Sequence, residues 1–273
     1  MVFINPHIDI RSISDIGLVR KNNEDFYGVS NTINGIVCVV CDGIGGNKGG
    51  EIASKIAVDT ISSFFENSKH KDIRTSIEES LIIANQNIIN RSKEDFQYDK
   101  MGTTSCILVL KENKAWYAHI GDSRIYLFSK RKKTLTQITK DHSLTQSLLD
   151  EGIIKEEDAL NHPSKHIIIK VLGIKDNVKP DICKNPIIPS NGDIFLLCTD
   201  GLHGEISDKE IESILREKIN LEQKSEKLLH AALNSGGHDN ITFQLVKIKK
   251  ELGIVKYLRL IAQKAKKATV SWC

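Results

Sequence analysis

Four aspartates of this chain stand in short, glycine-containing signatures that lie far apart in the sequence. The signatures are Cys41-Asp42-Gly43-Ile44-Gly45-Gly46, Gly121-Asp122-Ser123-Arg124, Cys198-Thr199-Asp200-Gly201 and Gly237-His238-Asp239-Asn240. Asp42 and Asp200 each follow a run of apolar, β-prone residues, which predicts that their carboxylates lie at the rim of a buried core. Carboxylates that converge repel one another unless cations lie between them, and hard divalent cations prefer oxygen ligands. The pattern predicts a metal-dependent enzyme built on a β-rich core.

The Asp42-Gly43 signature offers the strongest ligand chemistry. A carboxylate has two oxygens and can bridge two cations, while the carbonyl of Gly43 can serve as a further hard ligand. The neighbouring glycines let the backbone turn sharply and approach a ligand closely. Taken alone, an Asp-Gly pair is more typical of an ordinary turn. Four such signatures in one chain are difficult to explain as coincidental turns.

A second polar group lies near the N-terminus, where the segment from Ser14 to Arg20 leads into Asn22-Asn23-Glu24-Asp25. Arg20 is either a clamp that donates two parallel hydrogen bonds to a phosphoryl group or a surface arginine paired with a carboxylate. Glu24 and Asp25 either bind a metal, directly or through water, or form a solvated turn. The spacing leaves both alternatives open.

The remaining pattern predicts the elements that must position these residues. Asn34-Gly35 predicts a hairpin turn between strands at about 25–30 and 36–40. Helices are predicted at about 53–64, 72–91, after the Ser207 capping box and at 221–234. Further strands are predicted at 105–110, 115–120, 124–128, 167–172, 194–198 and 241–248. From His142 to about Lys165 the periodicity weakens, and we expect a mobile flap over the site there. Because helices are grouped rather than alternating with strands, the fold class is α+β.

Composition favours one large domain with a short C-terminal extension. The chain has 273 residues, and its sequence contains no linker-like or repeated segment. Seven of the 38 Lys and Arg residues, but only one of the 35 Asp and Glu residues, lie from Lys249 onward, so the body carries a formal charge of about −3 against +3 for the whole chain. A mildly acidic body does not suit nucleic-acid binding. No apolar run approaches the ~20 residues of a membrane span, and no signal peptide is recognisable.

The six cysteines favour a cytoplasmic protein with buried, reduced thiols. Cys38 and Cys41 have a CxxC spacing, but residues three apart in a strand point to opposite faces, and no second pair completes a zinc site. Neither Cys41 nor Cys198 has an arginine six residues later, as a tyrosine-phosphatase-type loop requires. We therefore expect no cysteine nucleophile.

Seven motifs in a fixed order give the chain a specific resemblance to a known family. They are Ser14-Asp15…Gly17…Arg20…Asn23-Glu24-Asp25, Asp42-Gly43-Ile44-Gly45-Gly46 with Gly50-Glu51 and Ala53-Ser54, Met101-Gly102-Thr103-Thr104, Gly121-Asp122-Ser123-Arg124, Asp141-His142-Ser143, Thr199-Asp200-Gly201-Leu202 and Asp239-Asn240-Ile241-Thr242. This series resembles the metal-dependent serine/threonine protein phosphatases of the type 2C (PPM) family, in their compact bacterial form. The resemblance extends from about Ser12 to Lys247.

The resemblance implies a four-layer αββα sandwich, in which two antiparallel β-sheets are flanked by helices, and a set of metal ligands. The implied ligands are Glu24, Asp42, Gly43, Asp122, Asp200 and Asp239. Asp42 would bridge two Mn²⁺ or Mg²⁺ ions, Asp200 and Asp239 would complete the first site, and the Gly43 carbonyl and Glu24 would belong to the second. Asp122 would share a third, weaker ion with Asp200.

The resemblance also implies the reaction. A hydroxide held between the two cations would attack the phosphorus of phosphoserine or phosphothreonine in a protein, while Arg20 binds the phosphate. Phosphorylated proteins would be the substrates, and a serine/threonine kinase of bacterial signalling and its targets would be the partners. The competing interpretations are a pseudophosphatase that serves as a regulatory binding module and a phosphoesterase for small molecules or nucleic acid. A pseudophosphatase should have lost ligands, yet all four aspartates are present.

Three residues depart from the simplest pattern. Ile44 stands where many eukaryotic members of the family have a histidine proposed as general acid, so the proton for the leaving group must come from a metal-bound water or another group. His203 either approaches the metals or is a partly exposed loop residue. His119 lies inside a predicted strand and fits a core residue better than a ligand.

The division predicted from these patterns is a catalytic domain at 1–248 and a basic amphipathic tail at 249–273. In the tail, the residues Ile254, Leu258, Ile261, Ala265 and Ala268 form one apolar stripe at helical spacing. Three alternatives remain for this helix: it folds back on the acidic body, lies on a membrane surface or docks on another protein.

Overall fold

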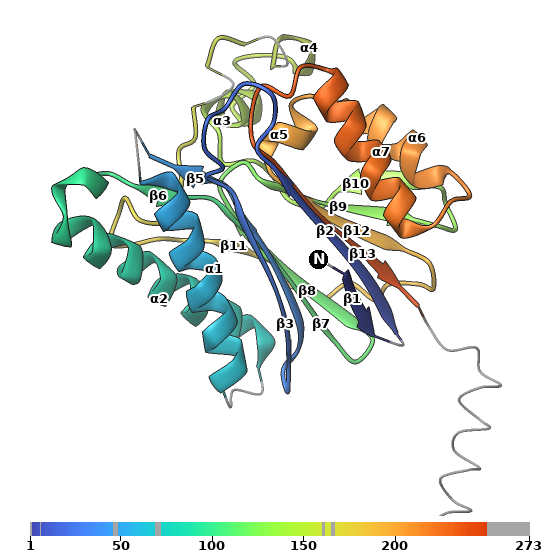
Figure 1. Cartoon of the computed structure of the whole chain (residues 1–273), viewed down its shortest axis with the longest axis horizontal. Helices are drawn as coiled ribbons and strands as arrows, with labels where there is room; N and C mark the ends of the chain where they lie inside the picture. Colours follow the sequence, from blue (N-terminus) through green and yellow to red (C-terminus); the bar gives the residue numbers. More distant parts are fainter. Residues whose placement is uncertain are drawn as a thin grey trace, which may run out of the picture.

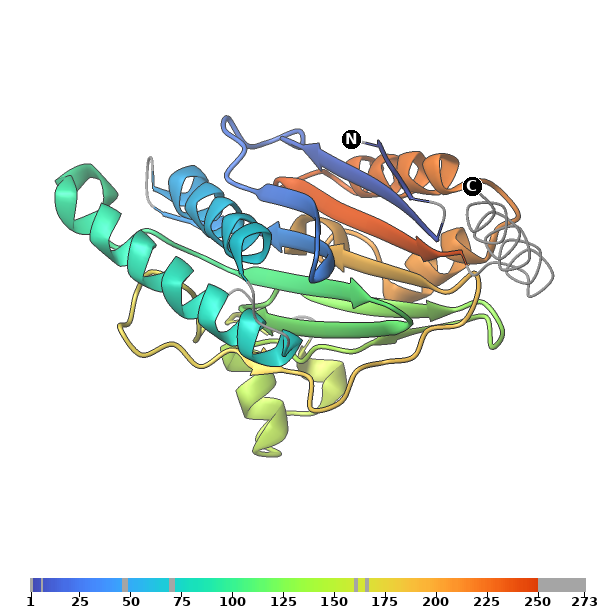
Figure 2. The same ribbon diagram turned by 90° about the horizontal axis from the view of Figure 1, so that it is seen from below.

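Two β-sheets lie face to face at the centre of the molecule, with helices over their outer faces (Figures 1 and 2). The computed structural model describes residues 2–5, 7–45, 49–68, 72–159, 162–164 and 167–249. The layers run helix, sheet, sheet, helix, so the predicted αββα sandwich is confirmed. Gly46 and the predicted tail helix lie outside the described residues.

The first sheet brings the start and the end of the described chain together. It contains six strands in the order β1-β2-β13-β12-β9-β10. Their bounds are β1 (Val2–Asn5), β2 (Ile8–Asp15), β9 (Arg124–Ser129), β10 (Thr134–Gln137), β12 (Ile194–Cys198) and β13 (Ile241–Ile248). In the antiparallel pairing of β2 with β13, Asp15 lies opposite Ile241. The loop after Asp15 and the loop before Ile241 therefore leave the sheet at the same end.

The second sheet has five strands in the order β11-β8-β7-β4-β3. Their bounds are β3 (Phe26–Thr32), β4 (Gly35–Cys41), β7 (Ser105–Lys111), β8 (Lys114–Ile120) and β11 (Asp181–Ile182). A separate two-stranded pair, β5 (Gly43–Ile44) with β6 (Gly102–Thr103), continues beyond β4. The predicted hairpin at Asn34-Gly35 joins β3 to β4, and Cys41 lies opposite Phe26.

Helices cover each sheet from outside (Figure 1). The second sheet is covered by α1 (Gly50–Asn67) and α2 (Ile73–Glu94), and the first by α5 (Asp200–His203), α6 (Asp208–Arg216) and α7 (Leu221–Asn234). The short α3 (Leu144–Asp150) and α4 (Glu156–Ala159) lie outside the layers, and the 3-10 turn η1 (Phe96–Tyr98) follows α2.

Side-chain caps explain where several helices begin. Asp72, Ser207 and Asn220 each accept a hydrogen bond from the backbone N–H three residues later, which satisfies a donor that the helix leaves free. At Asn220 the capping box is complete, because the Gln223 side chain also accepts from the Asn220 N–H at 3.2 Å. The predicted cap at Ser207 is present, whereas the cap at Asn220 was not predicted.

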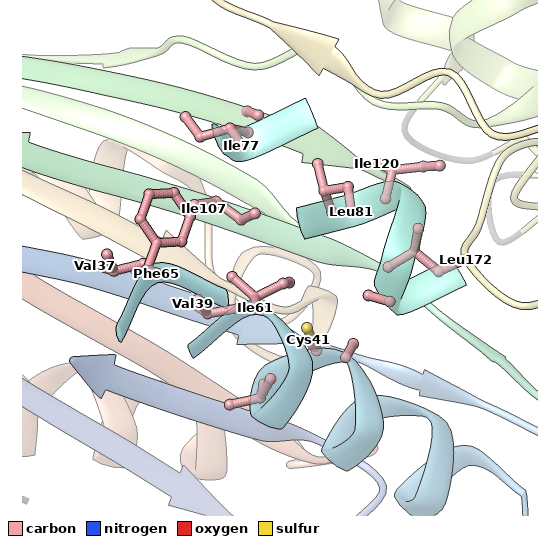
Figure 3. Close-up of a cluster of buried hydrophobic side chains, with 14 of the residues drawn as sticks. Val37, Val39, Cys41, Ile61, Phe65, Ile77, Leu81, Ile107, Ile120 and Leu172 are labelled. Atoms are coloured by element: carbon pink, nitrogen blue, oxygen red, sulfur yellow. The ribbon is translucent and has the colours of Figure 1, made fainter. Parts of the chain in front are cut away.

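Three buried clusters hold the layers together, one between each helical layer and its sheet and one between the sheets. Figure 3 shows the first cluster, in which Phe65 of α1 and Leu81 of α2 lie among side chains of β4 and β7. β4 is buried on both faces, so Cys41 belongs to this cluster while Cys38 belongs to the one between the sheets. The two thiols of the CxxC spacing therefore point apart, as predicted.

One buried lysine holds α6 against α7. Lys224 is only 4% exposed. Its ammonium donates to the carbonyls of Ile214, Leu215 and Glu217 at 3.1, 2.8 and 2.6 Å. Those carbonyls lie at the C-terminal end of α6, where the helix runs out of N–H donors, so the ammonium serves as their cap. The Ile214 carbonyl also accepts from the Glu217 N–H at 3.3 Å.

The predicted strand at 167–172 was wrong. Only isolated bridges occur there, between Ser143 and Ile168 and between Thr103 and Leu172. The apolar run is instead an irregular segment that faces a cleft on one side and the core on the other. Among the described residues, no helix combines the length and the apolar character needed to cross a membrane.

Candidate metal centre

The predicted carboxylates lie on loops at one end of the sandwich. Asp42 joins β4 to β5, Asp122 lies in the turn between β8 and β9, Asp200 begins α5 after β12, and Asp239 precedes β13. Antiparallel pairing places these strand ends together, since Cys198 lies opposite both Arg124 and Phe243. Both sheets therefore contribute ligand candidates to the same site.

A cleft of about 1110 Å³ opens at this end. The predicted residues that line it are Arg20, Glu24, Asp42, Gly43, Asp200 and Asp239. Asp122 is 6% exposed and does not line the cleft, but the negative charge of Asp200 acts on it. All seven sequence-predicted site residues thus lie in or beside one cleft.

The carboxylates of the site lie close enough for their negative charges to repel one another. Burial, together with the charges of Asp25 and Asp200, raises the pKa of Asp42 well above its ordinary value. Burial and Asp200 likewise raise the pKa of Asp122 to about 7. The buried Oδ1 of Asp122 has no hydrogen-bond partner among the described residues. Buried oxygens that repel one another and lack donors fit hard divalent cations.

Arg20 lies at the rim of the cleft, paired with a predicted ligand. Its Nη2 donates to Asp239 Oδ2 at 2.7 Å, and its side chain is 51% exposed. Burial alone would lower the pKa of Arg20, but the adjacent Asp239 outweighs it and raises that pKa. Of the two alternatives from the sequence, the pairing with a carboxylate is present, and the paired arginine also lines the cleft.

Asn240 connects the loops that carry Arg20, Glu24 and Asp239. Its Nδ2 donates to the carbonyls of Ile16 and Asn22 at 3.0 and 2.9 Å, and its Oδ1 accepts from the Glu24 N–H at 2.8 Å. From the sequence, Asn240 was recognised as part of a motif but was given no role. Its hydrogen-bond partners are more than 200 residues away in the sequence, so no local pattern could predict these contacts.

Asp25 is not a solvated turn residue. It is 5% exposed and accepts a hydrogen bond from Thr199 Oγ1 at 2.9 Å. Burial raises its pKa well above the ordinary value, although the hydrogen bonds from Thr242 and Thr199 oppose that rise. Asp25 is thus a buried carboxyl group whose charge would act on Asp42. Glu24, by contrast, lines the cleft, and burial raises its pKa despite the opposing charge of Arg20.

Two threonines of β6 and its extension fix the backbone of Asp42. The Asp42 N–H donates to Thr104 Oγ1 at 2.9 Å, and Thr103 Oγ1 donates to the Asp42 carbonyl at 2.8 Å. A Cβ at Gly43 would lie 2.2 Å from the carbonyl oxygen of Gly50. Glycine is therefore required there because the loop passes directly against the start of α1.

The Gly121-Asp122 turn is held from behind by polar contacts. Arg124 donates from Nε and Nη2 to the two oxygens of Asp141 at 3.0 and 2.8 Å. His203 donates from Nε2 to the Asp122 carbonyl at 3.1 Å. Burial lowers the pKa of His203 to about 3, so the neutral imidazole is the stable form. His203 positions the turn and does not approach a metal as a charged group.

A second group of potential ligands, His119, His142 and Asp181, lies outside the cleft, with ligand atoms within 4.8 Å of one another. The His119 and His142 rings stack at 4.6 Å. The Gly121 N–H donates to His142 Nδ1 at 3.1 Å, so the neutral ring carries its proton on Nε2, the atom that faces Asp181. His119 donates from Nε2 to the Lys140 carbonyl at 2.7 Å. His119 is thus a satisfied core residue, as predicted, and the group joins β8 to the loop at 140–142.

Comparison with known proteins places this arrangement among characterised enzymes. The sequence profile of the protein phosphatase 2C family matches residues 19–236. Protein phosphatase PhpP of Streptococcus pneumoniae is 38% identical over 248 residues, which cover 89% of this chain and 99% of PhpP.

Solved structures agree with the sequence relatives. The serine/threonine phosphatase Stp1 from Staphylococcus aureus superposes with a TM-score of 0.82 at 32% identity, covering 88% of this chain and 95% of Stp1. The catalytic domain of the serine/threonine protein phosphatase PstP in complex with two manganese ions gives a TM-score of 0.78 at 31% identity, covering 89% of this chain and 99% of that one.

Proposed function

The chain belongs to the protein phosphatase 2C family, and we infer that it is a metal-dependent phosphatase that hydrolyses phosphoserine and phosphothreonine in proteins. One observation carries this conclusion: carboxylates from both sheets converge with Arg20 in a single cleft. The alternative of a regulatory module without activity has no support, since all the aspartates remain in place.

We propose Mn²⁺ or Mg²⁺ as the cofactor, with two ions in the catalytic centre. Asp42 would bridge them, Asp200 and Asp239 would hold the first, and Gly43 and Glu24 the second. The raised pKa of Asp42 and the oxygen-only donor set support this assignment. The two manganese ions of the related PstP structure support the number. When bound, the ions supply a water-derived nucleophile at neutral pH and neutralise the charge of the phosphoryl oxygens.

A third ion would be held by Asp122 together with Asp200. The unpartnered Oδ1 of Asp122 and its pKa of about 7 support a ligand role. His203 and His142 hold the backbone of this turn, at the Asp122 carbonyl and the Gly121 N–H, so the Asp122 side chain remains available to an ion.

Arg20 would bind the substrate phosphate. Its exposed guanidinium at the rim can exchange Asp239 for the phosphoryl oxygens, to which it donates two parallel hydrogen bonds. Metal binding by Asp239 would favour this exchange, because the carboxylate charge is then shared with a cation. Arg20 thereby orients the phosphoryl group for in-line attack.

Among the described residues, the two cysteines nearest Asp42 in sequence are poor candidates for a protein nucleophile. Burial raises the pKa of Cys38 and of Cys41 to about 12, so neither forms a thiolate at neutral pH. Ile44 lines the cleft where an acid would otherwise stand. His238 also lines it, and its Nδ1 lies 2.9 Å from Glu205.

The deciding experiment measures hydrolysis of para-nitrophenyl phosphate and of a phosphothreonine peptide, with Mn²⁺ and with excess EDTA. We expect turnover of both substrates with Mn²⁺ and none with EDTA. Absence of turnover on both substrates with Mn²⁺ present would contradict the function.

We further propose a cytoplasmic location, in which a serine/threonine kinase produces the substrates. The described cysteines are all buried and free, as expected in a reducing compartment. The division into a catalytic domain at 1–248 and a basic tail also stays a proposal. At the boundary, Lys249 pairs with Asp9 at 3.1 Å.

A further inference from the structure

The catalytic cleft has a second side that the chemistry does not use. This side, which we call the cleft wall, is the segment 168–179. Its aliphatic residues in the cleft are Ile168, Ile169, Val171, Ile174 and Val178, and its cationic residues there are Lys170, Lys175 and Lys179. Among the described residues, this wall lines the cleft, while none of the described part of the predicted flap at 142–165 does so.

The charges of the wall are not neutralised locally. Lys170 lies 3.7 Å from Asp181, but Lys175 and Lys179 have no ion pair or hydrogen bond from their side chains among the described residues. Both of these lysines are exposed. Asp176, next to Lys175 in the sequence, offsets one of the three lysine charges. The wall therefore presents net positive charge beside exposed aliphatic surface, including Ile169 at 43% and Ile174 at 47% exposure.

The cleft wall is preorganised: hydrogen bonds and packing fix its backbone before a ligand binds. Asn85, which is 1% exposed, donates to the carbonyl of Lys175 at 2.8 Å and accepts from the Gly173 N–H at 2.7 Å. Leu172 is fully buried and lies in the cluster that joins α2 to the second sheet (Figure 3). A segment held this way loses little conformational entropy when a ligand binds.

The wall is also fixed relative to the metal centre. The backbone of Leu172 exchanges two hydrogen bonds with Thr103, at 3.1 and 2.9 Å. Thr103 in turn lies opposite Gly43 and donates to the carbonyl of Asp42. One residue of β6 thus sets the distance between the wall and the predicted bridging carboxylate.

We propose that the cleft wall binds the residues beside the phosphorylated side chain, and that it selects protein segments with acidic and aliphatic residues at those positions. This inference rests on the proposed phosphatase function. A phosphate bound near Arg20 and Asp42 leaves the flanking peptide along the wall, because both line the same cleft. Carboxylates of the peptide then pair with Lys175 and Lys179, while aliphatic side chains cover Ile169 and Ile174.

The test compares two phosphothreonine peptides of equal length on the Mn²⁺-loaded full-length protein. One carries glutamate and isoleucine beside the phosphothreonine, and the other carries glutamine and serine at the same positions. We expect kcat/KM for the first to exceed that for the second by about tenfold at low salt, and the ratio to shrink at about 1 M salt, where the Debye length is only about 3 Å. A ratio near one would overturn the proposal.

Reversing the charges of the wall lysines tests whether they cause the preference for the acidic peptide. The double variant Lys175→Glu with Lys179→Glu should reduce the ratio to about one or below, with kcat/KM for para-nitrophenyl phosphate within about twofold of wild type. The matched control, Lys111→Glu with Lys114→Glu, changes the same charge at the β7–β8 hairpin, outside this cleft, and should keep the wild-type ratio.

The outcomes separate this inference from the function on which it rests. An unchanged ratio in the wall variant, or an equal fall in the control variant, would refute a role for the wall while leaving the phosphatase intact. Failure of the wild type on para-nitrophenyl phosphate would instead refute the proposed function. In a third variant, Ile174→Asn, a smaller preference for isoleucine over serine is expected with the glutamate positions kept constant.

Discussion

Replacing Arg20 with alanine separates phosphate binding from structural pairing. The Arg20–Asp239 pair joins side chains that are 51% and 33% exposed, so its loss should cost about 0–1 kcal/mol of unfolding free energy. A charge-assisted hydrogen bond to a phosphoryl oxygen is worth more, about 1.5–3 kcal/mol. We therefore expect Arg20→Ala to lower kcat/KM by about 10- to 100-fold with little change in stability.

The same variant should not weaken metal binding. Because Arg20 Nη2 occupies one oxygen of Asp239 at 2.7 Å, its removal frees that oxygen. Affinity for Mn²⁺, measured by calorimetry, should stay equal or rise. Arg20→Lys should recover part of kcat/KM, because it restores the charge without the planar fork.

Three measurements decide whether Arg20 is a phosphate clamp. They are kcat and KM on a phosphothreonine peptide at saturating Mn²⁺, inhibition by inorganic phosphate, and the urea midpoint. The reasoning fails if both kinetic constants stay at wild-type values. It also fails if the loss of activity is matched by an equal loss of Mn²⁺ affinity, since Arg20 would then support the metal rather than the substrate.

Four further predictions concern the centre and its supports. Asp42→Asn should abolish Mn²⁺-dependent turnover yet raise the urea midpoint of the metal-free protein, because it removes a charge that burial and neighbouring carboxylates disfavour. Lys224→Met should lower the unfolding free energy by about 2–4 kcal/mol in urea, because three helix-end carbonyls lose their donor, while turnover by the folded protein is kept. For His142, burial lowers the pKa to about 4, so its neutral form contributes stability that is present above about pH 6.5 and is lost as the pH falls toward 4; His142→Asn should flatten that loss in urea titrations by up to about 3 kcal/mol. A protein truncated after Lys249 should keep Mn²⁺-dependent hydrolysis of para-nitrophenyl phosphate, because the matched family profile ends at residue 236.

Each of these predictions has a contrary result. A lower urea midpoint for metal-free Asp42→Asn would mean that the carboxylate has a structural partner. Lys227→Met, which breaks an exposed pair with Glu217, is the control for Lys224 and should cost less than about 1 kcal/mol. An unchanged acid limb in His142→Asn would contradict the role of His142 and assign the pH dependence to the other buried histidines, His119 and His203. A truncated protein that folds and binds Mn²⁺ without turnover would give the tail a catalytic role.

Local signatures in the sequence were sufficient for the centre of the site. Asp42 and Asp200 follow buried strands, and that position alone predicts a carboxylate at the edge of the core. The Asn34-Gly35 turn and the strand at 241–248 were likewise predicted from short patterns. These features depend on residues that are close in sequence, so they can be inferred without the fold.

Features that depend on distant contacts were missed. Asn240 holds the loop of Glu24, and Asn85 holds the loop of Lys175, across separations that no periodicity records. The apolar run at 167–172 was predicted as a strand because cleft-lining and core-facing residues have the same composition as a buried strand. Contacts with distant segments distinguish the two: Ile169 and Leu172 bond to His142 and Thr103 instead of to a continuous neighbouring strand. Asn85 of α2 then holds the residues that follow the run, at Gly173 and Lys175.

The concentration of every site residue at one end of the sandwich leaves the opposite end free to vary. The hairpin tips at Asn34-Gly35 and between β7 and β8 lie at that far end, and each joins its strands through a short turn. Ile33, at one of these tips, is 77% exposed. Inserted peptides or fused domains should be tolerated there, because neither the core nor the catalytic loops would have to move. The fold thus offers attachment points for sensors or localisation modules that leave the phosphatase reaction unchanged.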